Sequence, residues 1–169
     1  MTDDFGMRFI VYGAGGVGGV VGARLAQDGH DVVLIARGAH YEAIRGAGLR
    51  IESPDAVATL HLPVFNRPDQ LSLSTRDIVL LAMKSQDTLL ALDLLAAVAP
   101  AETPIVCMQN GVANESLTLS AATPTMTIRS RTSGANSSRS MTALRLTGWN
   151  ARGQEICSRA MSQVVRPMR

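Results

Sequence analysis

The stretch with the clearest chemical potential is residues 13–18, Gly-Ala-Gly-Gly-Val-Gly, which has the Gly-x-Gly-x-x-Gly spacing. We expect Gly13 to permit a tight turn, Gly15 to let a diphosphate approach the backbone, and Gly18 to allow close helix–strand packing. The amides of such a turn are free donors at a helix N-terminus, where the macrodipole also favours an anion. The spacing therefore predicts a dinucleotide site, with an ordinary structural turn as the alternative.

Arg37 occupies the position that selects between the two nicotinamide dinucleotides, directly after the apolar run 31–36. An acid there binds the ribose 2′-hydroxyl of NAD, whereas an arginine accommodates the 2′-phosphate of NADP. A charge-assisted hydrogen bond contributes about 1.5–3 kcal/mol, which would favour NADP by about 10- to 150-fold. We therefore expect NADP (NADPH) as the cofactor, and the alternative is that Arg37 is a solvated surface residue.

Two further polar residues follow apolar runs, Lys84 after residues 77–83 and Asn110 shortly after residues 104–108. In open α/β sheets the ligand lies in the crevice beyond the carboxyl ends of the strands. We therefore expect Lys84 and Asn110 to converge on the nicotinamide half of the cofactor. The alternatives are a surface lysine and a common Asn-Gly turn.

The order of apolar runs and helical segments around these residues predicts an α/β fold, a Rossmann-type, doubly wound parallel sheet. We expect helices that end near residue 28, over 39–47 and over 88–98, and a small antiparallel β insertion around 49–64. The predicted parallel strands lie near residues 7–12, 31–36, 77–83 and 104–108.

The chain has 169 residues, 46% of them hydrophobic and 4% aromatic, which suits one domain with an aliphatic core. No apolar run approaches the roughly 20 residues that span a bilayer, and the first four residues are acidic rather than basic. We expect a cytoplasmic protein without a membrane partner.

Cysteine and histidine spacing gives no metal signature. Cys107 and Cys157 lie far apart, and Cys107 is most simply a small buried hydrophobic residue. His30, His40 and His61 share no spacing, so we expect ordinary structural roles for all three.

With these residues assembled, the first 116 positions resemble the N-terminal domain of the ketopantoate reductase (2-dehydropantoate 2-reductase) family of pantothenate and coenzyme A biosynthesis. The combination is more specific than the glycine turn alone. The matching segments are residues 13–18, 35–37, 83–88, 109–112 and 114–115.

The resemblance implies an oxidoreductase that uses NADPH to reduce the 2-oxo group of ketopantoate to pantoate. The glycine turn would hold the diphosphate, Arg37 the 2′-phosphate, and Lys84 and Asn110, the catalytic candidates, the nicotinamide side and the adjoining substrate. The partner would be a small-molecule 2-oxo acid, and an exposed domain interface would allow a homodimer. The cofactor-binding set is then Gly13, Ala14, Gly15, Gly16, Val17, Gly18, Arg37, Lys84 and Asn110.

The resemblance ends near residue 116, where the composition changes. Residues 1–116 carry a net charge of −5, whereas residues 117–169 carry +7, with eight arginines against one acid and fifteen Ser or Thr residues. The family takes a proton from a lysine in a helical C-terminal domain, but Lys84 is the only lysine in this chain. The alternative function is therefore a truncated, catalytically inactive NADP(H)-binding module.

Three accounts of residues 117–169 are open. The segment is a basic extension for an acidic partner or nucleic acid, a reduced native subdomain with a helix over 156–165, or a frameshift-derived tail. Its arginines are spread evenly and only Trp149 could stack on a base, so we expect no nucleic-acid partner. The abrupt change to Arg, Ser and Thr favours the frameshift account, with residues 1–116 as the cofactor domain and 117–169 as an atypical, disordered or unselected tail in place of the helical domain.

Overall fold

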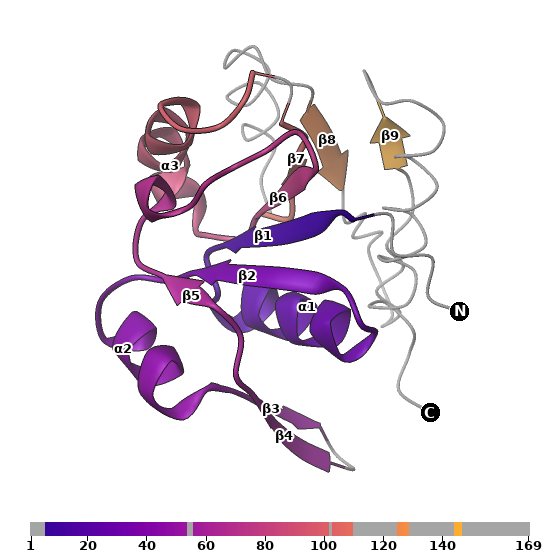
Figure 1. Ribbon diagram of the computed structural model, residues 1–169, viewed down its shortest axis with the longest axis vertical. Coiled ribbons are helices and arrows are strands. Elements are labelled where there is room, and N and C mark those ends of the chain that lie inside the picture. Colours follow the sequence, from indigo (N-terminus) through magenta and orange to yellow (C-terminus); the bar gives the residue numbers. More distant parts are fainter. Residues whose placement is uncertain (1–5, 54–55, 102, 110–124, 129–143, 147–169) are drawn as a thin grey trace, which may run out of the picture.

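The computed structural model describes residues 6–53, 56–101, 103–109, 125–128 and 144–146. Its centre is a seven-stranded sheet in the order β5-β2-β1-β6-β7-β8-β9, and a separate two-stranded sheet pairs β3 with β4 (Figure 1). The first six strands pair in parallel and β9 is antiparallel to β8. This is the doubly wound strand order, with its reversal between β1 and β6.

The N-terminal half contains a βαβ unit followed by a helix and a hairpin. The glycine-rich turn joins β1 to α1, and α2 joins β2 to the hairpin. The elements are β1 (Arg8–Tyr12), α1 (Gly16–Gln27), β2 (Asp31–Ile35), α2 (Gly38–Ala47), β3 (Leu49–Ser53) and β4 (Ala56–Leu60).

The remaining elements complete the sheet and cover its other face. They are β5 (Val64–Phe65), the short 3-10 helix η1 (Pro68–Gln70), β6 (Asp77–Leu81), the 3-10 helix η2 (Ser85–Asp87), α3 (Thr88–Ala96), β7 (Ile105–Cys107), β8 (Thr125–Ile128) and β9 (Leu144–Leu146).

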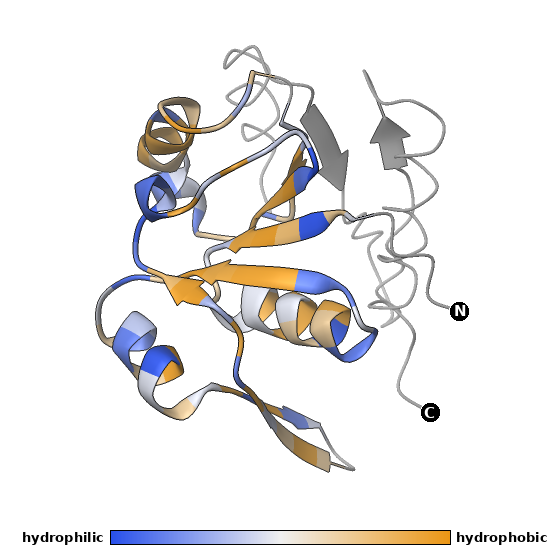
Figure 2. Ribbon diagram, viewed as in Figure 1, coloured by the Kyte–Doolittle hydropathy of each residue, from blue (hydrophilic) through white to orange (hydrophobic). Residues whose placement is uncertain are grey.

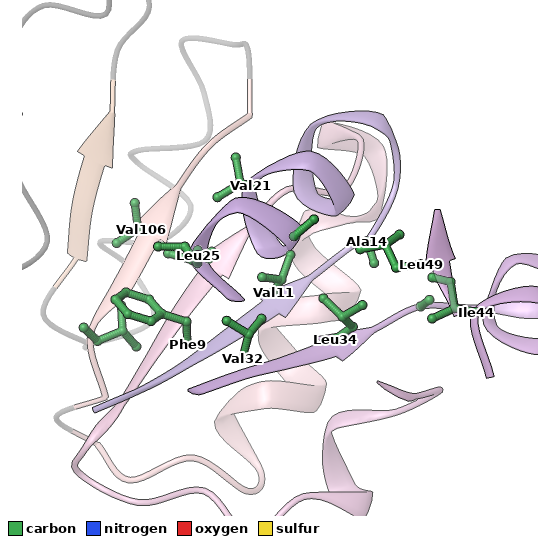
Figure 3. Packing of buried hydrophobic residues seen from close by; sticks show 14 residues of the cluster. Phe9, Val11, Ala14, Val21, Leu25, Val32, Leu34, Ile44, Leu49 and Val106 are labelled. Carbon is green, nitrogen blue, oxygen red and sulfur yellow. The ribbon is translucent and has the colours of Figure 1, made fainter. Parts of the chain in front are cut away.

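Alternate residues of the strands feed two separate cores, because successive side chains of a strand point to opposite faces. Phe9 and Val11 pack with Leu25 of α1 on one face (Figure 3). Ile10 lies on the other face, in the cluster that includes Leu92 of α3. The apolar residues that build both cores run along the central strands (Figure 2). The sheet is thus buried on both sides, as parallel sheets require.

The predicted α/β fold and its four parallel strands are confirmed, with strand ends that shift by one or two residues. The hairpin of β3 and β4 is the predicted antiparallel insertion. Val64, however, does not belong to that insertion: it begins β5, which pairs in parallel with β2. The expectation was wrong there because a two-residue strand is too short to show any periodicity.

Seven residues of the segment 117–169 lie in strands of the main sheet, β8 and β9. β8 extends the free edge of β7, and its sequence Thr-Met-Thr-Ile is rich in β-branched residues that favour strands. The other residues of that segment, including Cys157 and the helix expected over 156–165, lie outside the described residues. The boundary at residue 116 therefore stays a prediction.

Two smaller expectations concern buried and membrane-spanning residues. Cys107 is 1% exposed, within the core beside α3, as expected of a small hydrophobic residue. Within the described ranges, no helix is both long and apolar enough to cross a membrane.

An ion pair holds together β1 and β6 at the edge opposite the glycine turn. Arg8 and Asp77 are register partners, and the guanidinium binds both carboxylate oxygens, with Nε–Oδ1 2.8 Å and Nη2–Oδ2 2.9 Å. The Asp77 carboxylate also accepts a hydrogen bond from the Ser74 amide. The hydrogen bond between Arg8 and Asp77 raises the pKa of Arg8. Asp77 is 1% exposed, so this carboxylate depends on its partners.

We predict that Arg8→Ala lowers the free energy of unfolding by about 3 kcal/mol, because it leaves a buried carboxylate without its cation. Arg50→Ala is the control, since the Arg50–Glu52 pair is exposed and such pairs contribute about 0–1 kcal/mol. Urea denaturation measures both variants, and an equal, small loss in the two would contradict a structural role for the Arg8–Asp77 pair.

Candidate dinucleotide site

The glycine turn is anchored on both neighbouring strands. The amides of Gly13 and Ala14 both donate to the Ile35 carbonyl at the end of β2, at 2.9 and 3.2 Å. Gly13 has φ +100°, which favours glycine, and a Cβ there would lie 2.6 Å from the Met83 amide nitrogen. The turn therefore rests directly on the backbone that leaves β6.

Gly18 makes the second close contact of the turn. A Cβ on Gly18 would collide with the Gly13 carbonyl oxygen and would lie 2.8 Å from the Ala82 Cβ. The first turn of α1 is thus pressed against the start of the glycine turn and the end of β6. This is the close helix–strand packing expected of the last glycine in the motif.

Gly15 and Gly16, by contrast, face open space. A Cβ on either residue would meet no described protein atom within 4 Å. Gly15 is the N-cap of α1, it supplies no side-chain cap, and no acidic residue lies in the first turn. The first amides of a helix have no intrahelical acceptor, so this open space is lined by donors and fits a diphosphate.

His40 braces the turn from α2. Its Nε2 lies 2.6 Å from the Ala14 carbonyl oxygen, so the Nε2–H form of the imidazole donates this bond. His30 instead packs edge-on against Phe9, with ring centroids 5.4 Å apart. The sequence predicts ordinary roles for both, and only the structure reveals that His40 touches the turn.

Arg37 lies two residues beyond β2, where it is the N-cap of α2. Its Nη2 is 3.0 Å from Oδ2 of Asp87, and the two side chains are 57% and 31% exposed. Asp87 comes from the segment that follows β6, so the pair connects the ends of two parallel strands. The sequence does not predict this partner, because residues 50 apart become neighbours only through the strand order.

An open cleft of about 110 Å³, partly continuous with solvent, adjoins Gly13 and Arg37. Its apolar walls come from β1, β2 and α3, where Tyr12, Ile35 and Leu94 line it. Its polar lining consists of Arg37, Asn66, Arg67 and Asp87. Such a cleft can accept a flat heterocycle between apolar walls and an anion at the polar side.

The cleft's tyrosine is neutral at physiological pH. Burial raises the pKa of the Tyr12 phenol, against the positive charges of Arg37 and Arg67, which lower it. Tyr12 is 6% exposed and therefore serves mainly as a packing surface.

Lys84 follows Met83, the residue on which the glycine turn rests, and is exposed. Gln109 fixes the end of β7 beside it: Nε2 donates to the Met83 carbonyl at 2.9 Å and to the Thr88 hydroxyl at 2.7 Å. Asn110, the next residue, lies outside the described residues. Lys84 thus follows the backbone that contacts the glycine turn, and the roles of Lys84 and Asn110 stay predictions.

Sequence reasoning missed Arg67, Asp87 and the bracing role of Gln109. The sequence offers no signal for Arg67, because the strand that it follows, β5, is only two residues long and shows no periodicity. Among the described residues, no three His, Cys, Asp or Glu side chains gather as a metal site would need.

The sequence pattern of one protein family, described as Ketopantoate reductase PanE/ApbA, matches residues 9–149. That match covers most of the chain. The chain belongs to this family.

Individual relatives agree with this assignment. A 2-dehydropantoate 2-reductase of Mesorhizobium japonicum is 38% identical over 109 residues, which are 63% of this chain and 32% of that protein. A PanE/ApbA family ketopantoate reductase structure from Ralstonia eutropha has a TM-score of 0.74 at 25% identity, covering 95% of this chain and 55% of the other. A D-mandelate dehydrogenase solved with NADH and anilino(oxo)acetate shares the fold, with a TM-score of 0.74 at 18% identity over 94% of this chain and 54% of the other.

The chain spans about a third of the length of the curated ketopantoate reductases that it matches. In those comparisons the similarity covers about 110 residues, whereas the family pattern reaches residue 149 and so includes β8 and β9.

We predict that one alanine substitution in the glycine turn lowers stability and that another abolishes dinucleotide binding. Gly18→Ala should lower the free energy of unfolding by about 3 kcal/mol, because its Cβ collides with backbone. Gly15→Ala should change stability by less than about 1 kcal/mol but abolish dinucleotide binding, since its Cβ enters the open space. Thermal melts and dinucleotide titrations measure these effects, and unimpaired binding by Gly15→Ala would contradict a diphosphate site here.

Proposed function

We propose that this protein binds NADP(H) through the glycine turn and Arg37 and reduces a 2-oxo acid of the 2-dehydropantoate type. The observation that carries the proposal is the open, donor-lined face of Gly15 and Gly16 beside an arginine at the end of β2. The names of the family and of its relatives support the substrate class, and the D-mandelate dehydrogenase of the same fold, solved with NADH, supports a nicotinamide dinucleotide.

Different residues of the site would bind different parts of the cofactor. The α1 amides would hold the diphosphate, the apolar cleft beside Tyr12 would receive the adenine, and Arg37 would bind the 2′-phosphate. Lys84 and Asn110 would face the nicotinamide and the substrate from the ends of β6 and β7.

When bound, NADPH supplies a hydride to a carbonyl carbon. Negative charge then develops on the carbonyl oxygen and requires a donor beside it. Lys84, an exposed residue directly after Met83, would stabilise that charge through its ammonium group, and Asn110 would orient the substrate. Gln109 would keep their two strand ends together through Met83 and Thr88.

A second candidate function is a non-catalytic NADP(H)-binding module. It is favoured by one observation: Lys84 is the only lysine of the chain, so residues 117–169 offer no lysine as a general acid. We propose residues 1–116 as the cofactor domain under both functions, in a soluble protein of the cytoplasm.

Turnover distinguishes the two functions. Both predict that NADPH fluorescence changes on binding, but only the reductase predicts loss of NADPH absorbance after 2-dehydropantoate is added. Binding without oxidation would support the module, and failure to bind NADPH would contradict both.

Arg37→Ala should raise the dissociation constant of NADPH about 10-fold or more and change that of NADH less than 2-fold, because only NADPH carries the 2′-phosphate. Arg45→Ala is the control, since Arg45 is an exposed arginine of α2 whose guanidinium lies over the Tyr41 ring, 6.0 Å from its centroid. Fluorescence titration measures both constants, and equal weakening of the two dinucleotides would contradict phosphate recognition by Arg37.

A further inference from the structure

Arg67 is a second cation of the cleft that the proposed function leaves unused. It follows β5, the strand that pairs in parallel with β2 in the register Leu34–Val64 and Ile35–Phe65. Pairing continues one residue further, since the Ala36 amide donates to the Phe65 carbonyl at 3.0 Å. Arg37 and Arg67 therefore leave neighbouring strands at equivalent positions, two residues beyond the same pair.

Both arginines line the same cleft and both side chains are exposed, 57% for Arg37 and 60% for Arg67. Both guanidinium groups also act on the Tyr12 phenol, whose pKa is raised mainly by burial, lowered by these two charges and raised by the Asp69 carboxylate. Because they follow paired strands at equivalent positions and line one cleft, the two guanidinium groups can act on one ligand.

The charges of the cleft show why a second cation is needed. Asp87 also lines the cleft and pairs with Arg37 at 3.0 Å, so it offsets the positive charge of that arginine. The partner of Arg67 is Asp69, at 2.7 Å, which does not line the cleft. Each arginine is thus offset by one carboxylate, and Arg67 adds a second guanidinium that can donate charge-assisted hydrogen bonds to a phosphate.

We propose that Arg67 binds the 2′-phosphate of NADP(H) together with Arg37, so that the two in-register arginines form one phosphate clamp. In the structure each arginine forms an ion pair with a carboxylate, Arg37 with Asp87 and Arg67 with Asp69. Exposed ion pairs of this kind are weak, so a dianionic phosphate can displace them. The clamp rests on the proposed function, because it needs NADP(H) in this cleft.

Arg50 provides a matched control for the test. Like Arg67 it is exposed and pairs at 2.7 Å with an acid two residues later, but it belongs to the β3–β4 hairpin and does not line the cleft. Arg50→Gln and Arg67→Gln therefore remove the same kind of surface ion pair. Circular dichroism should show both variants folded.

Fluorescence titration of the full chain with NADPH and NADH tests the clamp. Arg67→Gln should raise the dissociation constant of NADPH about 10-fold and that of NADH less than 2-fold, whereas Arg50→Gln should change neither. Asp69→Asn, which releases Arg67, should tighten NADPH several-fold without affecting NADH.

The outcomes separate the clamp from the proposed function. If Arg37→Ala weakens NADPH selectively but Arg67→Gln does not, the clamp is wrong and the proposed function stands. Equal weakening of both dinucleotides by Arg67→Gln also overturns the clamp. If the wild-type protein binds neither dinucleotide, the proposed function fails and the clamp fails with it.

Discussion

The structure depends on the close approach of the glycine turn to the end of β6. Gly13 sits against the Met83 backbone, and Gly18 sits against the Gly13 carbonyl and Ala82, with no room for a Cβ at either position. Because side chains are excluded there, α1 begins directly above the reversal point of the sheet. Its amides then face open space at Gly15 and Gly16 rather than protein. One steric constraint thus creates both the packing of β1, α1 and β6 and the donor-lined face.

The same contact determines what surrounds that face. Residues after Met83 start at the turn, so Lys84 lies beside it and Asp87 reaches Arg37 at the end of β2. Gln109 ties β7 to this arrangement through the Met83 carbonyl. The Arg8–Asp77 pair holds the opposite edge of β1 and β6, where no ligand is expected. The sheet therefore separates a stabilising edge from a binding edge, as open α/β folds do.

The sequence predicts much of this because its signals are local. Apolar runs and glycines identify the four central strands, the three helices and the turn, and Arg37 is recognisable from its position after β2. Non-local features are not predicted. β5 is too short to show periodicity, and β8 lies in a segment whose composition predicts no packed element. The Arg37–Asp87 pair and the cleft can be predicted only once the strand order is known. Arg67 was missed for the same reason, since its equivalence to Arg37 appears only in the pairing of β2 and β5.

The most direct test of a diphosphate site at the glycine turn is a protein NMR titration with NADPH that follows individual backbone amides. The first amides of α1 are the donors in this account, so the signals of Gly15, Gly16 and Val17 should shift most as NADPH is added, and they should saturate together. Saturable binding of NADPH that leaves these three signals unmoved, with the largest shifts elsewhere in the chain, would contradict the account.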